Sequence, residues 1–239
     1  MSEKANKHIL VIGGSSGIGL AICRQLVAQN FTVIAASRSS SDELESMKVR
    51  QIQLDVTKLE DELDVLPDAI NGIVYCPGTI NLRPFKALKI EEFQHDLDIN
   101  FLGAVKVLQK TLKNLKKADG ASVVLFSTVA VKVGLNFHSS IAAAKGAIEG
   151  LGKSLAAEWA SSKIRVNMIA PSLTDTPLAR QLLSTPEKQE ASDKRHPIGR
   201  TGTAEDIANI ASFLISDNSS WITGQVLGVD GGFSTLKPV

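Results

Sequence analysis

The first candidate functional site in this sequence is a glycine cluster. It directly follows an apolar stretch and reads Gly13-Gly14-Ser15-Ser16-Gly17-Ile18-Gly19. Glycine tolerates positive φ and lets backbone approach a ligand closely. The helix expected behind the cluster would present free N–H groups and positive potential to an anion. The pattern predicts a pyrophosphate site, and a tight strand-to-helix turn without a ligand is the alternative.

A second position selects the nucleotide. An acidic residue about 20 residues beyond the glycines would hold a ribose 2′-hydroxyl. That window reads Ala35-Ala36-Ser37-Arg38 and contains no acid. Arg38 can pair with a 2′-phosphate through two hydrogen bonds, and Ser37 can add a hydroxyl. The sequence therefore predicts NADP(H) as cofactor, with a solvated loop arginine as the alternative.

A third group contains one lysine and two hydroxyls. Lys145 is isolated in the alanine-rich helical stretch 142–145, and Ile141 precedes it by four residues. A lysine placed so that it faces the sheet ends can bind ribose hydroxyls, and a solvated lysine is the alternative. Ser127 and Thr128 follow a strand and can orient a carbonyl. Equally, their hydroxyls can simply be satisfied at the end of that strand.

These groups need a scaffold, and the pattern of apolar runs predicts one. Short apolar strands alternate with helical segments, which indicates parallel pairing with helices on both faces. The expected strands are 8–12, 31–36, 52–54, 73–76, 123–127, 165–170 and 226–229, and the expected helices are 18–28, 91–117, 141–160 and 204–216. Right-handed crossovers then give an α/β, Rossmann-type doubly wound sheet of about seven strands. We expect residues 1–239 to form a single domain that binds ligands beyond the carboxyl ends of its strands.

Composition excludes several classes of protein. The 239 residues include 26 basic and 25 acidic side chains, so no basic field suggests nucleic acid. Cys23 and Cys76 have no metal-ligand spacing and form no disulfide framework, which favours a reducing compartment. The start of the sequence has no signal-peptide core, and no run of 18 apolar residues occurs. We expect a cytoplasmic protein with no metal and no membrane partner.

Taken together, the motifs resemble the short-chain dehydrogenase/reductase family over essentially the whole chain, especially its 3-oxoacyl-carrier-protein-reductase-like members. Gly13, Gly17 and Gly19 match the family's TGxxxGxG motif, with Ile12 in place of the threonine. The ending is also similar, from Pro197-Ile198-Gly199-Arg200 through Thr223-Gly224 to Val229-Asp230-Gly231-Gly232. The resemblance implies a nicotinamide-dependent oxidoreductase acting on a small carbonyl or alcohol, assembled as a homotetramer or dimer.

The resemblance also assigns site residues. Asp55 and Val56 match the segment that holds the adenine, and Asn100 matches a catalytic-site asparagine. For Asn100, a helix-kinking or capping role is the alternative. Gly78 ends the segment Tyr75-Cys76-Pro77-Gly78, which replaces the family's NNAG. The nicotinamide-covering segment supplies Pro171, Leu173, Thr174 and Thr176, with Ser172 in place of its usual glycine.

One departure lies at the chemistry. Thr128 aligns with the family's serine, because it precedes position 141 by the usual 13 residues, but position 141 is Ile instead of the catalytic tyrosine. Tyr75 is the only tyrosine, and we expect it to be a buried strand aromatic. Hydride delivery to a carbonyl creates an alkoxide that needs a proton, and a positioned acid contributes roughly 10²–10⁴-fold. Ile141 cannot supply that proton.

His138 is one candidate replacement. His138, Ile141 and Lys145 are spaced i, i+3, i+7 and share a stripe if the helix begins early enough. An unperturbed histidine pKa of about 6.5 suits proton transfer near neutrality. The alternative is a histidine without a chemical role in front of the helix, because Ser139 and Ser140 make better caps.

Three functions remain open from the sequence. The first is an NADP(H)-dependent oxidoreductase, of carbonyl reductase or alcohol dehydrogenase type, with an atypical acid site. The second is a catalytically silent NADP(H)-binding protein that acts as a sensor or partner-binding module. The third is a non-redox lyase or isomerase on the same scaffold. In each case, residues 177–196 are expected to form a lid over the substrate.

Overall fold

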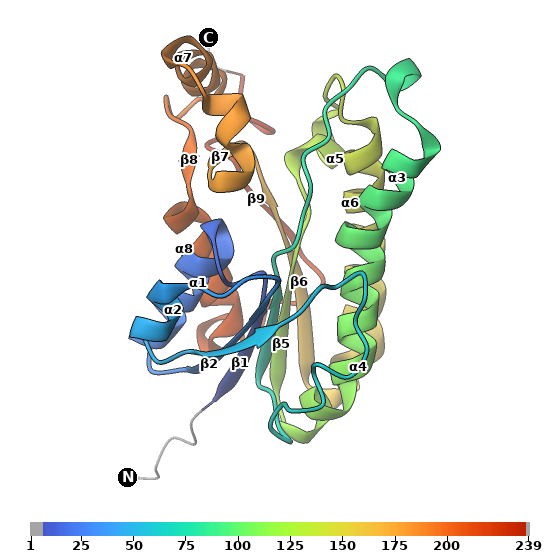
Figure 1. The fold of residues 1–239 in the computed structure, drawn as a ribbon, viewed down its shortest axis with the longest axis vertical. Coiled ribbons are helices and arrows are strands. Elements are labelled where there is room, and N and C mark those ends of the chain that lie inside the picture. The colour runs from blue at the N-terminus through green and yellow to red at the C-terminus, as the bar shows by residue number, and fades with distance from the viewer. Residues whose placement is uncertain (1–6, 238–239) are drawn as a thin grey trace.

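Seven parallel strands form one sheet in the order β3-β2-β1-β4-β5-β6-β9 (Figure 1). The strands are β1 (His8–Ile12), β2 (Thr32–Ser37), β3 (Arg50–Gln53), β4 (Gly72–Tyr75), β5 (Ala121–Phe126), β6 (Ile164–Pro171) and β9 (Val226–Val229). The structure, a computed structural model, describes residues 7–237. The order reverses at β1, which pairs with β2 on one side and β4 on the other. This is the doubly wound arrangement that the sequence predicts, and it opens a crevice at the carboxyl ends of these strands.

Strand β1 shows why the sheet is covered on both faces. Successive side chains of a strand point to opposite faces. Leu10 and Ile12 belong to one buried hydrophobic cluster, whereas Ile9 and Val11 belong to another. All four are almost fully buried. A continuous apolar run such as HILVI is therefore what a strand between two helical layers requires.

The helices form those two layers (Figure 1). In chain order they are α1 (Gly17–Ala28), α2 (Asp42–Ser46), α3 (Ile90–Leu97), α4 (Gly103–Lys117), α5 (Val129–Val133), α6 (Ser139–Trp159), α7 (Pro186–Arg195) and α8 (Ala204–Ile215). Helices α1 and α8 pack against each other on one face of the sheet, and α4 and α6 cover the other. Helix α3 packs against α6. Strands and crossovers thus place α1 and α6 on opposite sides of the crevice.

The long helix expected over 91–117 is interrupted. A π-helical turn, Asp98–Leu102, lies between α3 and α4. The Tyr75 hydroxyl donates a 2.6 Å hydrogen bond to the Ile99 carbonyl within that turn. Gly103 packs so closely on this hydroxyl and on Val56 that a Cβ would overlap both. Tyr75 is therefore the buried strand aromatic that we expected, and it supports the turn that contains Asn100.

The segment expected to be a lid contains regular structure of its own. It begins as a 3-10 helix, Pro177–Leu183, and continues into α7 at the carboxyl end of the sheet. His196, which follows α7, is buried. Its Nε2 lies 2.9 Å from Ser172 Oγ, and its Nδ1 lies 2.8 Å from the Ser192 carbonyl oxygen. The end of the segment is therefore fastened to the end of β6.

The two remaining strands are short. They are β7 (Thr174–Asp175) and β8 (Gly202–Thr203), which form a separate parallel pair beside the same segment. As for membranes, no helix between residues 7 and 237 combines the length and apolar character needed to cross a bilayer.

The Tyr75→Phe substitution tests the support of the π-helical turn. It removes the donor to the Ile99 carbonyl, and a hydrogen bond of this kind contributes about 0.5–1.5 kcal/mol. Urea unfolding should show a loss of this size with an unchanged denaturant slope. Unchanged stability would show that the hydroxyl does not hold the turn.

Candidate cofactor cleft and active site

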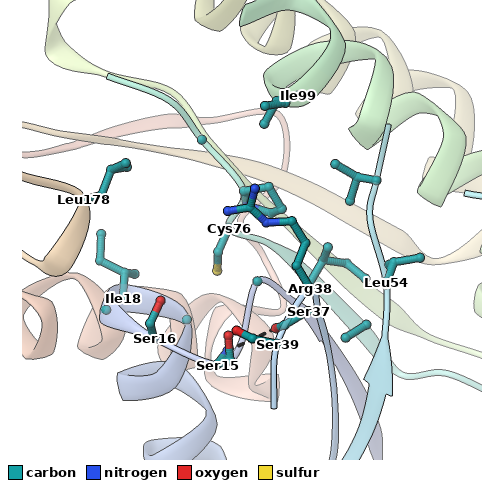
Figure 2. A pocket seen from close by; sticks show the side chains of 18 of the residues that line it. Ser15, Ser16, Ile18, Ser37, Arg38, Ser39, Leu54, Cys76, Ile99 and Leu178 are labelled. Atoms are coloured by element: carbon teal, nitrogen blue, oxygen red, sulfur yellow. Dashed lines mark hydrogen bonds between the residues drawn. The ribbon is translucent and has the colours of Figure 1, made fainter. Parts of the chain in front are cut away.

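A cleft of about 280 Å³ lies at the carboxyl ends of the central strands, where the sheet order reverses. It is open to solvent and is bounded by the glycine loop, the end of β2, the segment after β4 and the start of the lid segment (Figure 2). Most residues predicted to bind the cofactor line it, namely Gly13, Ser15, Ser16, Gly17, Ile18, Gly19, Ser37, Arg38, Asp55, Val56, Gly78 and Thr176. The fold therefore gathers segments that are far apart in the sequence around one elongated hollow.

The glycine loop is tied to the neighbouring strand. The Gly13 N–H donates to the Ala36 carbonyl at 2.7 Å, and the Ser15 N–H donates to Ser37 Oγ at 3.1 Å. Gly13 has φ +78°, in the left-handed region that favours glycine. At Gly19, a Cβ would overlap the Gly13 carbonyl, so the loop can lie on the helix only when this residue is glycine.

The N-terminus of α1 faces this loop with its N–H groups free of side-chain caps. Ser16 occupies the N-cap position and makes no side-chain hydrogen bond to the helix. The first turn contains no acidic residue. Unsatisfied N–H groups and the positive end of the helix dipole attract an anion, and no side chain competes for them. The arrangement fits a pyrophosphate.

Arg38 lies just beyond β2, between Ser37 and Ser39 (Figure 2). Among residues 7–237 its guanidinium makes no hydrogen bond or ion pair with another side chain. The nearby Asp55 already accepts from the hydroxyl and N–H of Thr57. These bonds, chiefly, and the Arg38 charge hold the pKa of Asp55 below its usual range. Arg38 is thus a cation at the end of β2, on the cleft lining, without a side-chain partner among the described residues.

Several residues of the cleft were not identified from the sequence. They are Ile12, Ala36, Ser39, Leu54, Cys76, Pro77, Ile99, Pro177 and Leu178. Cys76 and Pro77 directly follow β4 and belong to the segment that replaces the family's NNAG. Their place in the cleft could therefore have been predicted from the sequence. Ile99 lies in the π-helical turn and Leu178 lies in the 3-10 helix. The sequence pattern predicts neither element, so it could not place these two residues in the cleft.

Four of the predicted cofactor residues lie away from this cleft lining. Leu173 and Thr174 line a separate hollow of about 190 Å³ together with His196 and Asp230. Pro171 and Lys145 line neither. Thr174 also donates to the Ser172 carbonyl at 3.0 Å, which shapes the backbone after β6.

Lys145 is buried in α6, with 7% of its surface exposed. Burial, above all, lowers its pKa from 10.5 to about 8, while Cys76 and Asp96 oppose the shift. Its Nζ makes no hydrogen bond within the described part of the chain. The position that a Cβ on Gly78 would take lies 3.7 Å from this Nζ. The ammonium therefore points toward the residue that lines the inner end of the cleft.

Asn100 faces Gly78 from the other side. Its Nδ2 donates to Thr79 Oγ1 at 2.9 Å and to the Asp96 carbonyl at 2.8 Å. Its Oδ1 is buried, has no partner, and lies 3.4 Å from the same Gly78 Cβ position. An orphaned buried acceptor beside an unpaired ammonium is costly unless a ligand or water completes it. This corner therefore fits the ribose and nicotinamide end of a dinucleotide, which carries hydroxyls.

The two hydroxyls after β5 differ. Ser127 Oγ donates to a Glu149 carboxylate oxygen at 2.6 Å, so it is the satisfied hydroxyl of the alternative interpretation. Thr128 caps α5 and accepts from the Ala130 N–H at 3.3 Å. The Thr128 hydroxyl hydrogen remains available to a substrate oxygen.

The position of the missing tyrosine is apolar and closed. Ile141 lies in the first turn of α6 with 6% of its surface exposed. The helix begins at Ser139, so the stripe that would have included His138 does not form. His138 occupies the N-cap position, and its Nδ1 lies 2.7 Å from the Asn136 carbonyl oxygen. Its role as the replacement acid stays a prediction, and this geometry does not favour it.

We next consider whether the described residues could bind a metal ion. Within residues 7–237, no group of three or more His, Cys, Asp or Glu side chains is arranged to hold an ion. Cys23 and Cys76 are both free thiols.

A doubly wound sheet with a glycine loop at its reversal point defines a dinucleotide-binding α/β protein. A profile described as Enoyl-(Acyl carrier protein) reductase matches residues 13–234. The chain belongs to the short-chain dehydrogenase/reductase family, whose members are oxidoreductases that use a nicotinamide cofactor.

The relatives span nearly the full length of the chain. It is 32% identical to a tropinone reductase homolog of Arabidopsis thaliana, covering 95% of this chain and 92% of the relative. It is also 32% identical to the 3-oxoacyl-[acyl-carrier-protein] reductase of Thermotoga maritima, covering 95% and 97%. A solved short-chain dehydrogenase family protein from Francisella tularensis superposes with a TM-score of 0.90 at 29% identity, covering 97% of this chain and 100% of that one.

The Gly78→Ala substitution tests the corner beside Lys145. The backbone of Gly78 is not left-handed, and the new methyl would meet Asn100 Oδ1 and Lys145 Nζ at ordinary contact distance. The protein should fold with stability within about 1 kcal/mol of the wild type, but calorimetric titration should show weaker binding of a nicotinamide dinucleotide. Gly150→Ala, on α6 with open space around it, is the matched control. Equal affinities in both variants would place the cofactor elsewhere.

Proposed function

We propose that this protein is an NADP(H)-dependent reductase of small carbonyl compounds whose acid site has been rebuilt. The observation that carries the proposal is the unpaired Arg38 in a cleft whose glycine loop and helix N-terminus await a pyrophosphate. An NAD-selective site would carry an acid there. Relatives named as reductases, such as the L-xylulose reductase of Bos taurus at 32% identity, support the direction toward a carbonyl substrate.

In this proposal the chain holds the dinucleotide along the cleft. The loop from Gly13 to Gly19 receives the pyrophosphate, Arg38 with Ser37 receives the 2′-phosphate, and Asp55 with Val56 borders the adenine. Lys145 and Asn100 face the ribose and nicotinamide end. The segment with Pro171, Leu173, Thr174 and Thr176 closes over the nicotinamide. When bound, the reduced nicotinamide supplies a hydride.

The substrate side is formed by the hydroxyl of Thr128 and the surface of α6. Thr128 orients the carbonyl by donating its free hydroxyl hydrogen. Ile141 gives an apolar wall that excludes water but supplies no proton. Residues 177–196 act as the lid, because they form two short helices next to the cleft and end at the fastened His196.

The protein then acts as a single domain over residues 1–239. By analogy with the family, it assembles as a homotetramer or dimer in the cytoplasm. Sedimentation of the full chain would measure that assembly directly.

A second function stands beside the first. The closed apolar Ile141 favours a catalytically silent NADP(H)-binding protein, because a reductase without a proton donor turns over slowly. Binding of NADPH without reduction of any carbonyl in a broad panel would favour this second function.

The Arg38→Ala substitution tests the cofactor. Loss of a charge-assisted contact to the 2′-phosphate should weaken NADPH binding about 10- to 100-fold and leave NADH binding nearly unchanged. Arg50→Ala, at an exposed arginine on β3, is the matched control. A parallel loss for both nucleotides, or none for NADPH, would contradict the assignment.

The Ile141→Tyr substitution tests the acid site. The hydroxyl would enter the position four residues before Lys145 on the same helical face. If the wild type is limited by proton supply, NADPH oxidation against a carbonyl panel should rise by roughly 10²-fold or more. Ile141→Phe supplies the same bulk without the hydroxyl and should not gain. An equal response of both variants would show that proton supply does not limit the wild type.

A further inference from the structure

Asp96 is the only buried carboxylate in the part of the chain that the structure describes, and Lys145 is the only buried lysine or arginine there. They come from neighbouring helices, since α3 packs against α6. Isolated buried charges are costly, so two opposite charges in one interior region require a common explanation. They are not in direct contact, because no ion pair joins them.

The hydrogen bonds around Asp96 hold its carboxylate in place. Ser140 Oγ donates to one carboxylate oxygen and Thr79 Oγ1 to the other, each at 2.6 Å. The Thr79 hydroxyl oxygen also accepts from Asn100 Nδ2 at 2.9 Å. Asn100 thereby connects Asp96 to the corner where the Lys145 ammonium lies.

The same region is where the family's proton donor is missing. Ser140, which binds Asp96, directly precedes Ile141, and Lys145 lies one turn further along α6. Nζ has no partner among the described residues and faces Gly78 at the end of the cleft. The donor position is closed by an apolar side chain, and the ammonium of Lys145, one turn along the same helix, carries protons and has no partner among the described residues.

We propose that Lys145 supplies the proton for carbonyl reduction and that Asp96 is the positioning residue that keeps its ammonium charged. This inference rests on the proposed function as a reductase. As the carbonyl carbon gains the hydride, the electron pair of the C=O π bond moves to oxygen. That oxygen forms an O–H bond as one Nζ–H bond of Lys145 breaks, and its electron pair stays on nitrogen. The carbonyl is reduced, the cofactor is oxidised, and solvent reprotonates the neutral amine.

The acidity of Lys145 suits this role. Its pKa of about 8, lowered chiefly by burial, makes it a far stronger acid than an exposed lysine and lies close to neutrality. Two titratable groups on neighbouring elements act on it, namely Cys76 after β4 and Asp96 on α3. Burial raises the pKa of the Cys76 thiol, so this group is neutral near pH 7. Glu149, on the next turn of α6, accepts a hydrogen bond from the Ser127 hydroxyl. Cys76 and then Asp96 oppose the lowering of the Lys145 pKa by burial, and of these two groups Asp96 is the carboxylate held by Ser140 and Thr79.

The direction of the pH dependence follows. Lys145 carries its proton below a pH of about 8 and loses it above, so carbonyl reduction should fall as pH rises through that value. Removal of the Asp96 charge lowers the pKa of Lys145 further. The falling limb should then move to lower pH.

The first test needs no cofactor and no activity. Lys145 in the full-length protein is labelled with trace acetic anhydride from pH 6 to 11, and its labelled fraction is read by peptide mass spectrometry. The wild-type midpoint should lie near 8, and Asp96→Asn should shift it to lower pH. Asp98→Asn, at a partly exposed carboxylate bound to Gln94, is the matched control and should leave it in place. A wild-type midpoint near that of exposed lysines, or no shift in Asp96→Asn, overturns the proposal.

The second test uses Lys145→Arg, which retains a cation but cannot release a proton near neutrality. Reduction of the best carbonyl at saturating NADPH should fall by roughly 10²–10⁴-fold, and NADPH affinity is measured on the same variant to separate binding from turnover. Turnover that survives in Lys145→Arg but is lost in His138→Ala overturns the proposal and assigns the proton to His138. A wild type that does not bind NADPH contradicts the proposed function, while the labelling midpoints still decide whether Asp96 controls Lys145.

Discussion

Parallel pairing of β1 with β2 on one side and β4 on the other is the interaction on which the site depends. Both faces of these strands are sealed by helices, since alternate β1 residues enter two different cores. A ligand can then reach the strands only at their ends. The reversal at β1 spreads the chain after β2 away from the chain after β4. The glycine loop lies between them and is held there by the bond from Gly13 to Ala36.

The two ends of the resulting cleft follow different physical rules. At the outer end, charge is exposed, because neither the Arg38 guanidinium nor the N-terminus of α1 has a side-chain partner among residues 7–237. At the inner end, the charged side chains are buried. Asp96 takes hydrogen bonds from Ser140 and Thr79, and Asn100 links that network to the corner beside Lys145. The outer end therefore supplies the exposed cation and N–H groups of the cleft, and the inner end supplies the buried polar network beside Lys145.

Much of the fold could be predicted from the sequence because periodicity is a local property. The strands at 8–12 and 226–229 have the predicted bounds, and the doubly wound order follows from alternating strands and helices. The helix expected over 91–117 failed at 98–102, because the π-helical turn depends on Tyr75, which lies on a strand more than 20 residues away.

The same division applies to the site. The glycines, Arg38 and Lys145 could be predicted as site residues from their residue type and from their position relative to the expected strands and helices. Asp96 could not, because nothing near it in the sequence says that a carboxylate on α3 is buried. Its partners come from positions 79 and 140, which meet only in the folded chain. The role of His138 stays a prediction, because it depends on where α6 begins, and His138 lies at the N-cap of that helix.

The central claim is that a cleft built for NADPH still transfers hydride although its tyrosine is replaced by Ile141. The most direct measurement uses NADPH deuterated at the nicotinamide C4, incubated with the wild-type protein and a panel of ketones and aldehydes below pH 8. Mass spectrometry should find an alcohol with one deuterium on the former carbonyl carbon, formed at a rate that falls above that pH. Tight NADPH binding with no deuterium in any product would contradict the claim.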